Sequence, residues 1–131
     1  MALHRFVVIA VVFGVGIPGS AGAHHSDGAY DSDHPATMEG TVKSVNWTNP
    51  HITFVIEKAG KNGAPPTTWI LEVSSPGVLT RSGWTKHSLR PGDHGVFRFS
   101  PLRDGGAGGY LKKVTLPSGQ ELSYSLTPGE K

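Results

Sequence analysis

The sequence predicts a small all-β domain of five or six strands, with one short helix between the third and fourth strands. Glycine and proline, 18 and 10 in number, divide the 131-residue chain into short segments, and short strands joined by tight turns are typical of all-β domains. Several of these segments alternate apolar and polar residues, which is the period of a strand with one buried face. The content of 37% hydrophobic and 17% charged residues suits one globular domain.

Residues 1–23 have the layout of a cleavable signal peptide. A short start that carries Arg5 precedes the apolar run Phe6–Ile17, and small residues lead from there to Ala23. Cleavage after Ala21 and retention as a membrane anchor are the alternatives, but the apolar run is shorter than the roughly 20 residues that span a bilayer. Cleavage after Ala23 leaves 108 residues of the 131, enough for one modest core.

The predicted barrel domain covers residues 37–126, between an extended polar arm at 24–36 and a frayed C-terminus at 127–131. The first strand is expected at Thr37–Trp47. Gly40 lies inside it and suggests a bulge or a sharp bend, which would let one strand serve two sheets.

The second and third strands are expected to form a hairpin around the loop AGKNGAPP. HITFVIEK, at residues 51–58, and TTWILEV, at 67–73, both alternate with a period of two. One face of each strand is therefore expected to face the core. These faces carry Ile52, Phe54 and Ile56 in the second strand and Trp69, Leu71 and Val73 in the third.

A short helix and the remaining strands complete the domain. Ser75 and Pro76 are a suitable N-cap and first-turn residue, and Gly83 is a suitable stop, so one or two helical turns are expected between them. The strands GVFRFSPL and YLKKVTL follow on either side of the loop DGGAGG, and ELSYSL supplies a short sixth strand. This order of strands and helix is the order of an OB barrel. A generic antiparallel sandwich is the alternative.

The composition excludes several classes of function. The chain has no cysteine, so the domain has neither disulfides nor thiolate metal ligands. Removal of Arg5 reduces the 12 basic residues to 11, against 10 acidic ones, and their scattered positions argue against a nucleic-acid binder. There is no G-x-S-x-G nucleophile elbow and no phosphate loop with its lysine. We therefore expect no hydrolase triad, and lean against an enzyme.

The histidines are the strongest candidates for a binding site. Cleavage after Ala23 would give His24 a free α-amino group beside its imidazole, and the two nitrogens can chelate one metal ion. His25 is adjacent, while His34 precedes the first expected strand and His51 opens the second. An arm folded back toward the Asn49-Pro50-His51 turn would bring three or four nitrogens together, in a geometry that resembles a copper-binding histidine brace. These ligands favour copper(II), with zinc as the less favoured ion.

Simpler explanations of the same histidines stay open. A polar N-terminal arm is often solvated and binds nothing. For His51 the alternative role is a hydrogen bond that closes its turn beside Asn49. The aromatic residues offer instead the stacking platform that OB barrels use for sugars or single-stranded nucleic acid; they are Trp47, Trp69, Trp84, Tyr30 and Tyr110. Of the tryptophans, Trp69 is expected in the core and Trp84 at the barrel end, which leaves Trp47 as the exposed one. A metal-free module for an oligosaccharide or a peptide is therefore the alternative function. A copper oxidase resembling polysaccharide monooxygenases is disfavoured, because the chain is too small for a broad substrate surface.

Four motifs resemble a known family. AHHS at the processing site, EGTVKSVNWTNPH, SPGVLTRSGW and LRPGD are similar to small secreted bacterial periplasmic proteins that are catalogued as a domain of unknown function and begin with His-His-Ser. The resemblance covers nearly all of the processed chain, although HGVFRFSPL replaces a strand that is usually rich in valine. It implies a periplasmic location and an OB-like fold, and it carries no activity. The leading hypothesis is a non-enzymatic periplasmic metal-binding protein.

Overall fold

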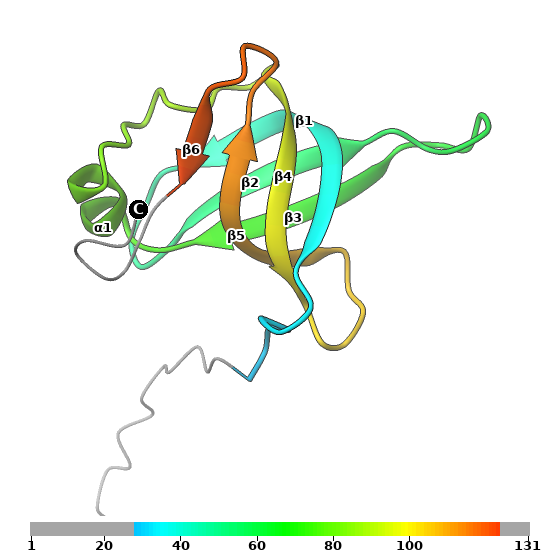
Figure 1. The fold of residues 1–131 in the computed structure, drawn as a ribbon, viewed down its shortest axis with the longest axis horizontal. Helices are drawn as coiled ribbons and strands as arrows, with labels where there is room; N and C mark the ends of the chain where they lie inside the picture. The colour runs from blue at the N-terminus through cyan, green and yellow to red at the C-terminus, as the bar shows by residue number, and fades with distance from the viewer. Residues whose placement is uncertain (1–27, 124–131) are drawn as a thin grey trace, which may run out of the picture.

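The computed structural model describes residues 28–123. The predicted signal peptide, His24, His25 and the predicted frayed C-terminus lie outside these residues. Within them the chain forms six strands and one short helix (Figure 1). Their bounds are β1 (Ala36–Asn46), β2 (Ile52–Lys58), β3 (Thr67–Val73), α1 (Pro76–Arg81), β4 (His94–Pro101), β5 (Gly108–Thr115) and β6 (Glu121–Ser123).

The strands close into the predicted OB-like barrel. The sheet runs in the order β3-β2-β1-β4-β5-β6 with antiparallel neighbours, and a parallel pairing of β3 with β5 joins its two sides. Five strands thus make the barrel, while β6 extends it as an extra strand beside β5 (Figure 1). The single helix lies between β3 and β4 in the chain, as expected.

Strand β1 pairs on both sides, which explains why it is the longest strand described. Its first part, up to Thr41, pairs with β4, and its second part, from Thr41 onward, pairs with β2. A Cβ atom at Gly40 would lie 2.6 Å from Cγ2 of Ile56, so only glycine permits the close approach of β2 at this bend. The irregularity in pairing lies between Val42 and Ser44, so the bulge is not at Gly40 itself.

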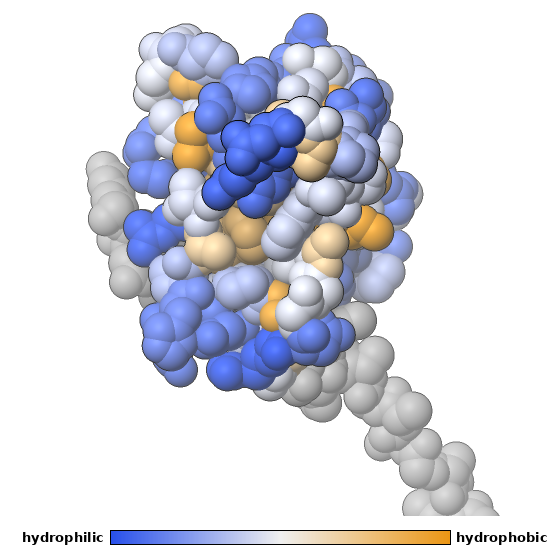
Figure 2. Space-filling view, turned by 90° about the vertical axis from the view of Figure 1, so that its right-hand side faces the viewer, coloured by the Kyte–Doolittle hydropathy of each residue, from blue (hydrophilic) through white to orange (hydrophobic). Residues whose placement is uncertain are grey.

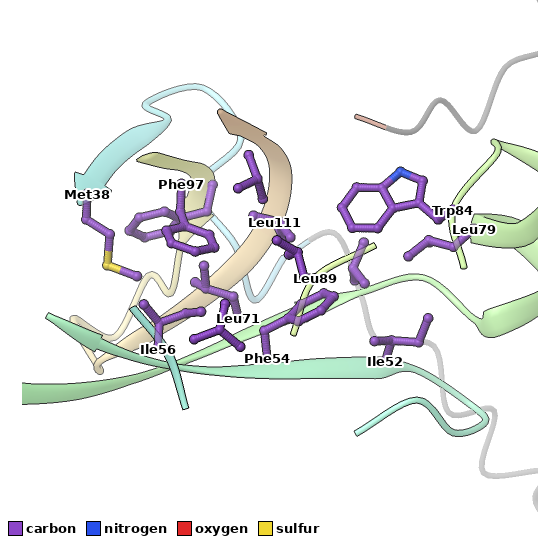
Figure 3. Packing of buried hydrophobic residues seen from close by; sticks show 14 residues of the cluster. Met38, Ile52, Phe54, Ile56, Leu71, Leu79, Trp84, Leu89, Phe97 and Leu111 are labelled. Carbon is purple, nitrogen blue, oxygen red and sulfur yellow. The ribbon is translucent and has the colours of Figure 1, made fainter. Parts of the chain in front are cut away.

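The interior is filled by the predicted apolar faces of the strands. Phe54 and Ile56 of β2 and Leu71 of β3 are fully buried against Phe97 of β4 and Leu111 of β5 (Figure 3). Trp69 is only half-buried at the margin of this core, where its ring meets Phe99 edge-on at 5.6 Å.

One end of the barrel is covered by α1 and the segment that follows it. The Ser75 hydroxyl accepts a hydrogen bond from the Val78 amide, and Gly83 adopts a φ of +87° after the helix, so the predicted cap and stop are both confirmed. Leu79 and Trp84 close the core at this end (Figure 3). No helix within residues 28–123 has the length and hydropathy needed to cross a bilayer.

The described surface is largely polar. Seen from the side toward which the β2–β3 hairpin projects, hydrophilic residues surround small and separate hydrophobic spots (Figure 2). Among the described residues, only Ile70 and Val96 are large hydrophobic side chains classed as exposed. The apolar content of this part of the chain is therefore concentrated in the core.

Barrel closure depends on Gly109, which pairs with Leu71 of β3 and with Pro101 of β4. A Cβ atom there would lie 2.6 Å from the carbonyl oxygen of Ser100 and would overlap the Phe99 ring. Gly109→Ala is expected to lower the free energy of unfolding by about 1–3 kcal/mol, the usual effect of overpacking. Urea unfolding measures this change.

Gly77→Ala is the matched control, since the nearest atom to its added Cβ is Nη1 of Arg81 at 3.6 Å. We expect this helix substitution to leave stability unchanged or to raise it by up to about 1 kcal/mol. Equal stability of the two variants would contradict the tight closure at Gly109.

Candidate functional site

The candidate site lies on the outer surface of the barrel where β3 pairs with β5. Four side chains from four segments meet there, and we call them the seam cluster. They are Tyr30 of the arm, His51 immediately before β2, Glu72 of β3 and Tyr110 of β5.

Strand alternation places Glu72 at the centre of the seam cluster. Its neighbours Leu71 and Val73 are fully buried, so Glu72 points to the outer surface of the barrel. Across the strands it faces Thr53 of β2 on one side and Tyr110 of β5 on the other. The Glu72 side chain keeps only 20% of its exposure, and a carboxylate this enclosed requires polar partners.

The two carboxylate oxygens of Glu72 contact different partners. Oε1 lies 2.5 Å from Nδ1 of His51. His51 comes directly after Pro50, whose peptide bond with Asn49 is cis. Oε2 accepts a hydrogen bond from the Tyr30 hydroxyl at 3.2 Å. Oε1 is buried, and its contact with Nδ1 does not have the geometry of a hydrogen bond in the described residues. A carboxylate only accepts hydrogen bonds, so a hydrogen bond between these two atoms would need the ring proton on Nδ1. Sequence reasoning offered a hydrogen bond beside Asn49 as the role of His51, whereas the structure pairs it with β3.

Tyr30 is held in the phenolic form by its surroundings. Burial raises the pKa of Tyr30 to about 12, and the negative charge of Glu72 and the hydrogen bond to it act in the same direction. The Tyr30 ring packs against Tyr110 with centroids 5.4 Å apart. The hydroxyl is therefore a permanent donor to Glu72 at any pH near neutrality.

Backbone hydrogen bonds fix the described end of the arm beside the last residue of β4 and the segment that follows it. The Asp31 amide donates to the carbonyl of Pro101 at 2.8 Å, and the Arg103 amide donates to the carbonyl of Ala29 at 3.0 Å. Tyr30 forms an isolated antiparallel bridge with Leu102 between these two bonds. The position of Tyr30 thus follows from backbone pairing as well as from its side chain.

His34 belongs to a separate pair on the arm. Its Nδ1 lies 3.0 Å from Oδ2 of Asp31, and its side chain is 83% exposed. This hydrogen bond lowers the pKa of Asp31 below its ordinary value, partly opposed by burial, and the charges of His34 and Arg103 add to the lowering.

The histidines named from the sequence are thus distributed over different places. His51 lies in the seam cluster, His34 pairs with Asp31, and His24 and His25 lie outside the described residues. Within residues 28–123, no three histidine, aspartate or glutamate side chains are grouped closely enough to hold a metal ion. Metal ligation by any of the four histidines therefore stays a prediction.

The aromatic residues do not form one platform. Tyr30 and Tyr110 are in contact in the seam cluster, whereas Trp84 is buried and its Nε1 donates to the carbonyl of Ser123. Trp47 is half-buried, contrary to its expected exposure, and lines a hollow of about 410 Å³ with Lys86 and Arg90. The stacking surface predicted from the sequence is therefore divided between separate places.

Residues 14–112 match a family of unknown function, DUF6152. The chain belongs to this family. All four residues of the seam cluster lie within the part that defines DUF6152 membership, and the predicted resemblance to a domain of unknown function is confirmed. No curated protein and no solved structure matches the chain.

Sequence reasoning did not single out Glu72. The available signal was its position as the one charged residue of the otherwise apolar stretch WILEV. A charge in such a strand marks the outward face and needs partners when neighbouring segments cover it. The parallel pairing that brings Tyr110 beside it is a long-range contact, which local periodicity does not reveal.

The raised pKa of Tyr30 gives a direct test of the seam cluster. In an NMR titration of the tyrosine ring carbons, assigned with Tyr30→Phe, we expect Tyr30 to ionise near 12 rather than at the ordinary 10. Glu72→Gln should lower the pKa by removing the adjacent negative charge, while burial keeps it above 10.

Glu57→Gln is the matched control, because Glu57 lies on β2 and pairs with Lys43. It should leave the titration of Tyr30 unchanged. Ionisation of Tyr30 at 10 in the parent protein, or an equal effect of both glutamine variants, would contradict the described contact.

Proposed function

We propose that this member of DUF6152 is a non-enzymatic periplasmic protein that binds copper through His24, at the N-terminus of the processed chain, together with His51. The observation that carries the proposal is the contact between Nδ1 of His51 and the Glu72 carboxylate. Metal-binding histidines commonly donate one ring N–H to a carboxylate, which orients the ring and makes it a stronger ligand.

In this proposal His51 binds the metal as a neutral ring with its proton on Nδ1. Such a ring would offer the lone pair of Nε2, the nitrogen opposite Glu72, to the ion. The half-buried ring, with 27% of its side chain exposed, also loses little further freedom when it binds an ion. Glu72 thereby acts as a positioning residue and not as a ligand in this proposal.

The hydrogen bond from Tyr30 is evidence for the proposal because it joins the arm to the carboxylate that His51 also contacts. Tyr30 donates to the same carboxylate that orients His51, and six residues separate it from His24 in the sequence. An extended segment of that length spans up to about 20 Å. The backbone bonds of Ala29 and Asp31 hold the described end of the arm beside β4 and Arg103, and the proposal requires the residues before it to extend to the seam cluster.

The proposed ligands are the amine and imidazole of His24 and the imidazole of His51, with His25 as a further candidate. Nitrogen ligands of this kind bind copper(II) most tightly among the common divalent metals, and zinc less tightly. The α-amine has an ordinary pKa of about 7.7–8.0, so copper competes with only a weakly held proton near neutral pH. His34 is the least supported candidate, because Asp31 already holds its Nδ1.

A second candidate function is a metal-free module for an oligosaccharide or a peptide. It is favoured by the hollow of about 410 Å³ in which Trp47 lies with Leu89 and Pro91. In that case Trp47→Ala should weaken binding of the ligand, while alanine at His24 and His25 should leave it unchanged.

Calorimetric titration with copper(II) tests the main proposal on the processed chain that begins with His24. We expect binding tighter than micromolar, and Glu72→Gln should weaken it by about 10–100-fold, the usual effect of removing a residue that orients a metal ligand. His51→Ala should weaken it at least as much, because a ligand itself is lost.

His94→Ala is the matched control, since His94 lies on β4 and its Nε2 contacts a different carboxylate, that of Glu39. An additional residue before His24 should also weaken binding, because it removes the amine from the chelate. Affinity weaker than micromolar, or equal affinity of all these proteins, would rule the proposal out.

A further inference from the structure

A second polar site lies on the outer face of β4 and β5, and it uses none of the proposed copper ligands. Arg98 of β4 pairs directly with Lys113 of β5, and the register then shifts so that Phe99 pairs with Leu111. Lys112 is thus the extra residue of a β-bulge. The bulge places two consecutive lysines opposite one arginine.

This arrangement brings positive charges together without full compensation. Like charges directly opposite each other on neighbouring strands destabilise a sheet. Glu121 of β6 forms an ion pair with Lys113 at 2.7 Å, and Nζ of Lys112 lies 5.1 Å from the centre of the Tyr110 ring. Of the three positive side chains, only Lys113 therefore has a described carboxylate partner.

The three cations surround a hollow of about 380 Å³, which we call the basic hollow. None of the described residues that line it is acidic. Two hydroxyl groups face each other at its wall, where Ser100 donates to Ser32 of the arm at 3.4 Å. Ser100 is itself buried, with 1% of its surface exposed, so its hydroxyl is held in a fixed place. The remaining lining residue is Pro35.

We propose that the basic hollow binds a phosphate group. Arg98 and Lys112 supply charged donors, and the Ser32 hydroxyl, which accepts a hydrogen bond from Ser100, supplies a neutral one. A phosphate offers three acceptor oxygens and a charge of about −1.5 to −2 at neutral pH. This matches the excess of two positive charges left by the pair of Lys113 with Glu121. A carboxylate offers fewer oxygens and only one charge, so it matches the hollow less well.

The same phosphate chemistry occurs in free phosphate esters and in lipid headgroups. Both are tested on the processed full chain at low salt, because salt screens exposed charges. Inorganic phosphate is titrated in a calorimeter. In parallel, the protein is sedimented with vesicles of phosphatidylglycerol or, for comparison, of zwitterionic phosphatidylcholine.

Lys112→Gln and Arg98→Gln each remove one donor of the hollow. We expect each to weaken the binding of phosphate by about tenfold, the usual effect of losing one hydrogen bond to a charged group. Lys61→Gln is the matched control, since it removes the same charge from the exposed β2–β3 loop. It should change the affinity by less than about twofold, because a charge on a distant loop is screened.

Each outcome decides the proposal. Saturable binding of inorganic phosphate that the two hollow variants weaken supports the site for free phosphate groups. Binding only to phosphatidylglycerol vesicles, weakened by the same variants, assigns the hollow to a lipid phosphate. No binding in either experiment overturns the proposal, as does an equal loss in Lys61→Gln, which would show a general effect of charge. His51→Ala should bind phosphate normally, so the result is independent of copper binding.

Discussion

The parallel pairing of β3 with β5 is the contact on which the rest of the structure depends. It joins the two sides of the sheet into a barrel, and it requires glycine at position 109 because the backbone of β4 lies so close. The same pairing sets Glu72 beside Tyr110. Closure of the core and assembly of the seam cluster therefore have one origin, although one lies inside the barrel and the other outside.

Tyr110 connects the two surfaces for which functions are proposed. Its ring contacts Tyr30 in the seam cluster and lies near Lys112 at the basic hollow. The arm contributes to both surfaces as well, with Tyr30 bonded to Glu72 and Ser32 bonded to Ser100. Fixing residues 29–31 to the segment after β4 therefore orders side chains at both places.

Much of the fold is predictable because it follows from local patterns. The alternation of β2 and β3 identifies their buried faces, and Ser75, Pro76 and Gly83 mark the short helix. The element order then indicates the barrel. Trp47 was expected to be exposed, but it packs against the core, since side-chain burial at a strand end depends on segments distant in sequence.

The site was less predictable for the same physical reason. His51 and Tyr30 were named from their residue types, yet their common partner is a glutamate of another strand. Two contacts 42 and 21 positions apart in sequence meet on Glu72, and no local period encodes them. The bulge at Lys112 is likewise visible only once the register of β4 and β5 is known.

The central claim is that proteolytic processing creates the copper chelate at His24. Native mass spectrometry of the exported protein, isolated with and without added copper, tests it most directly because one spectrum gives both the first residue and the stoichiometry. The account predicts a chain that begins at His24 and retains one copper ion. A mature chain that begins elsewhere, or one that begins at His24 and retains no copper, would contradict it.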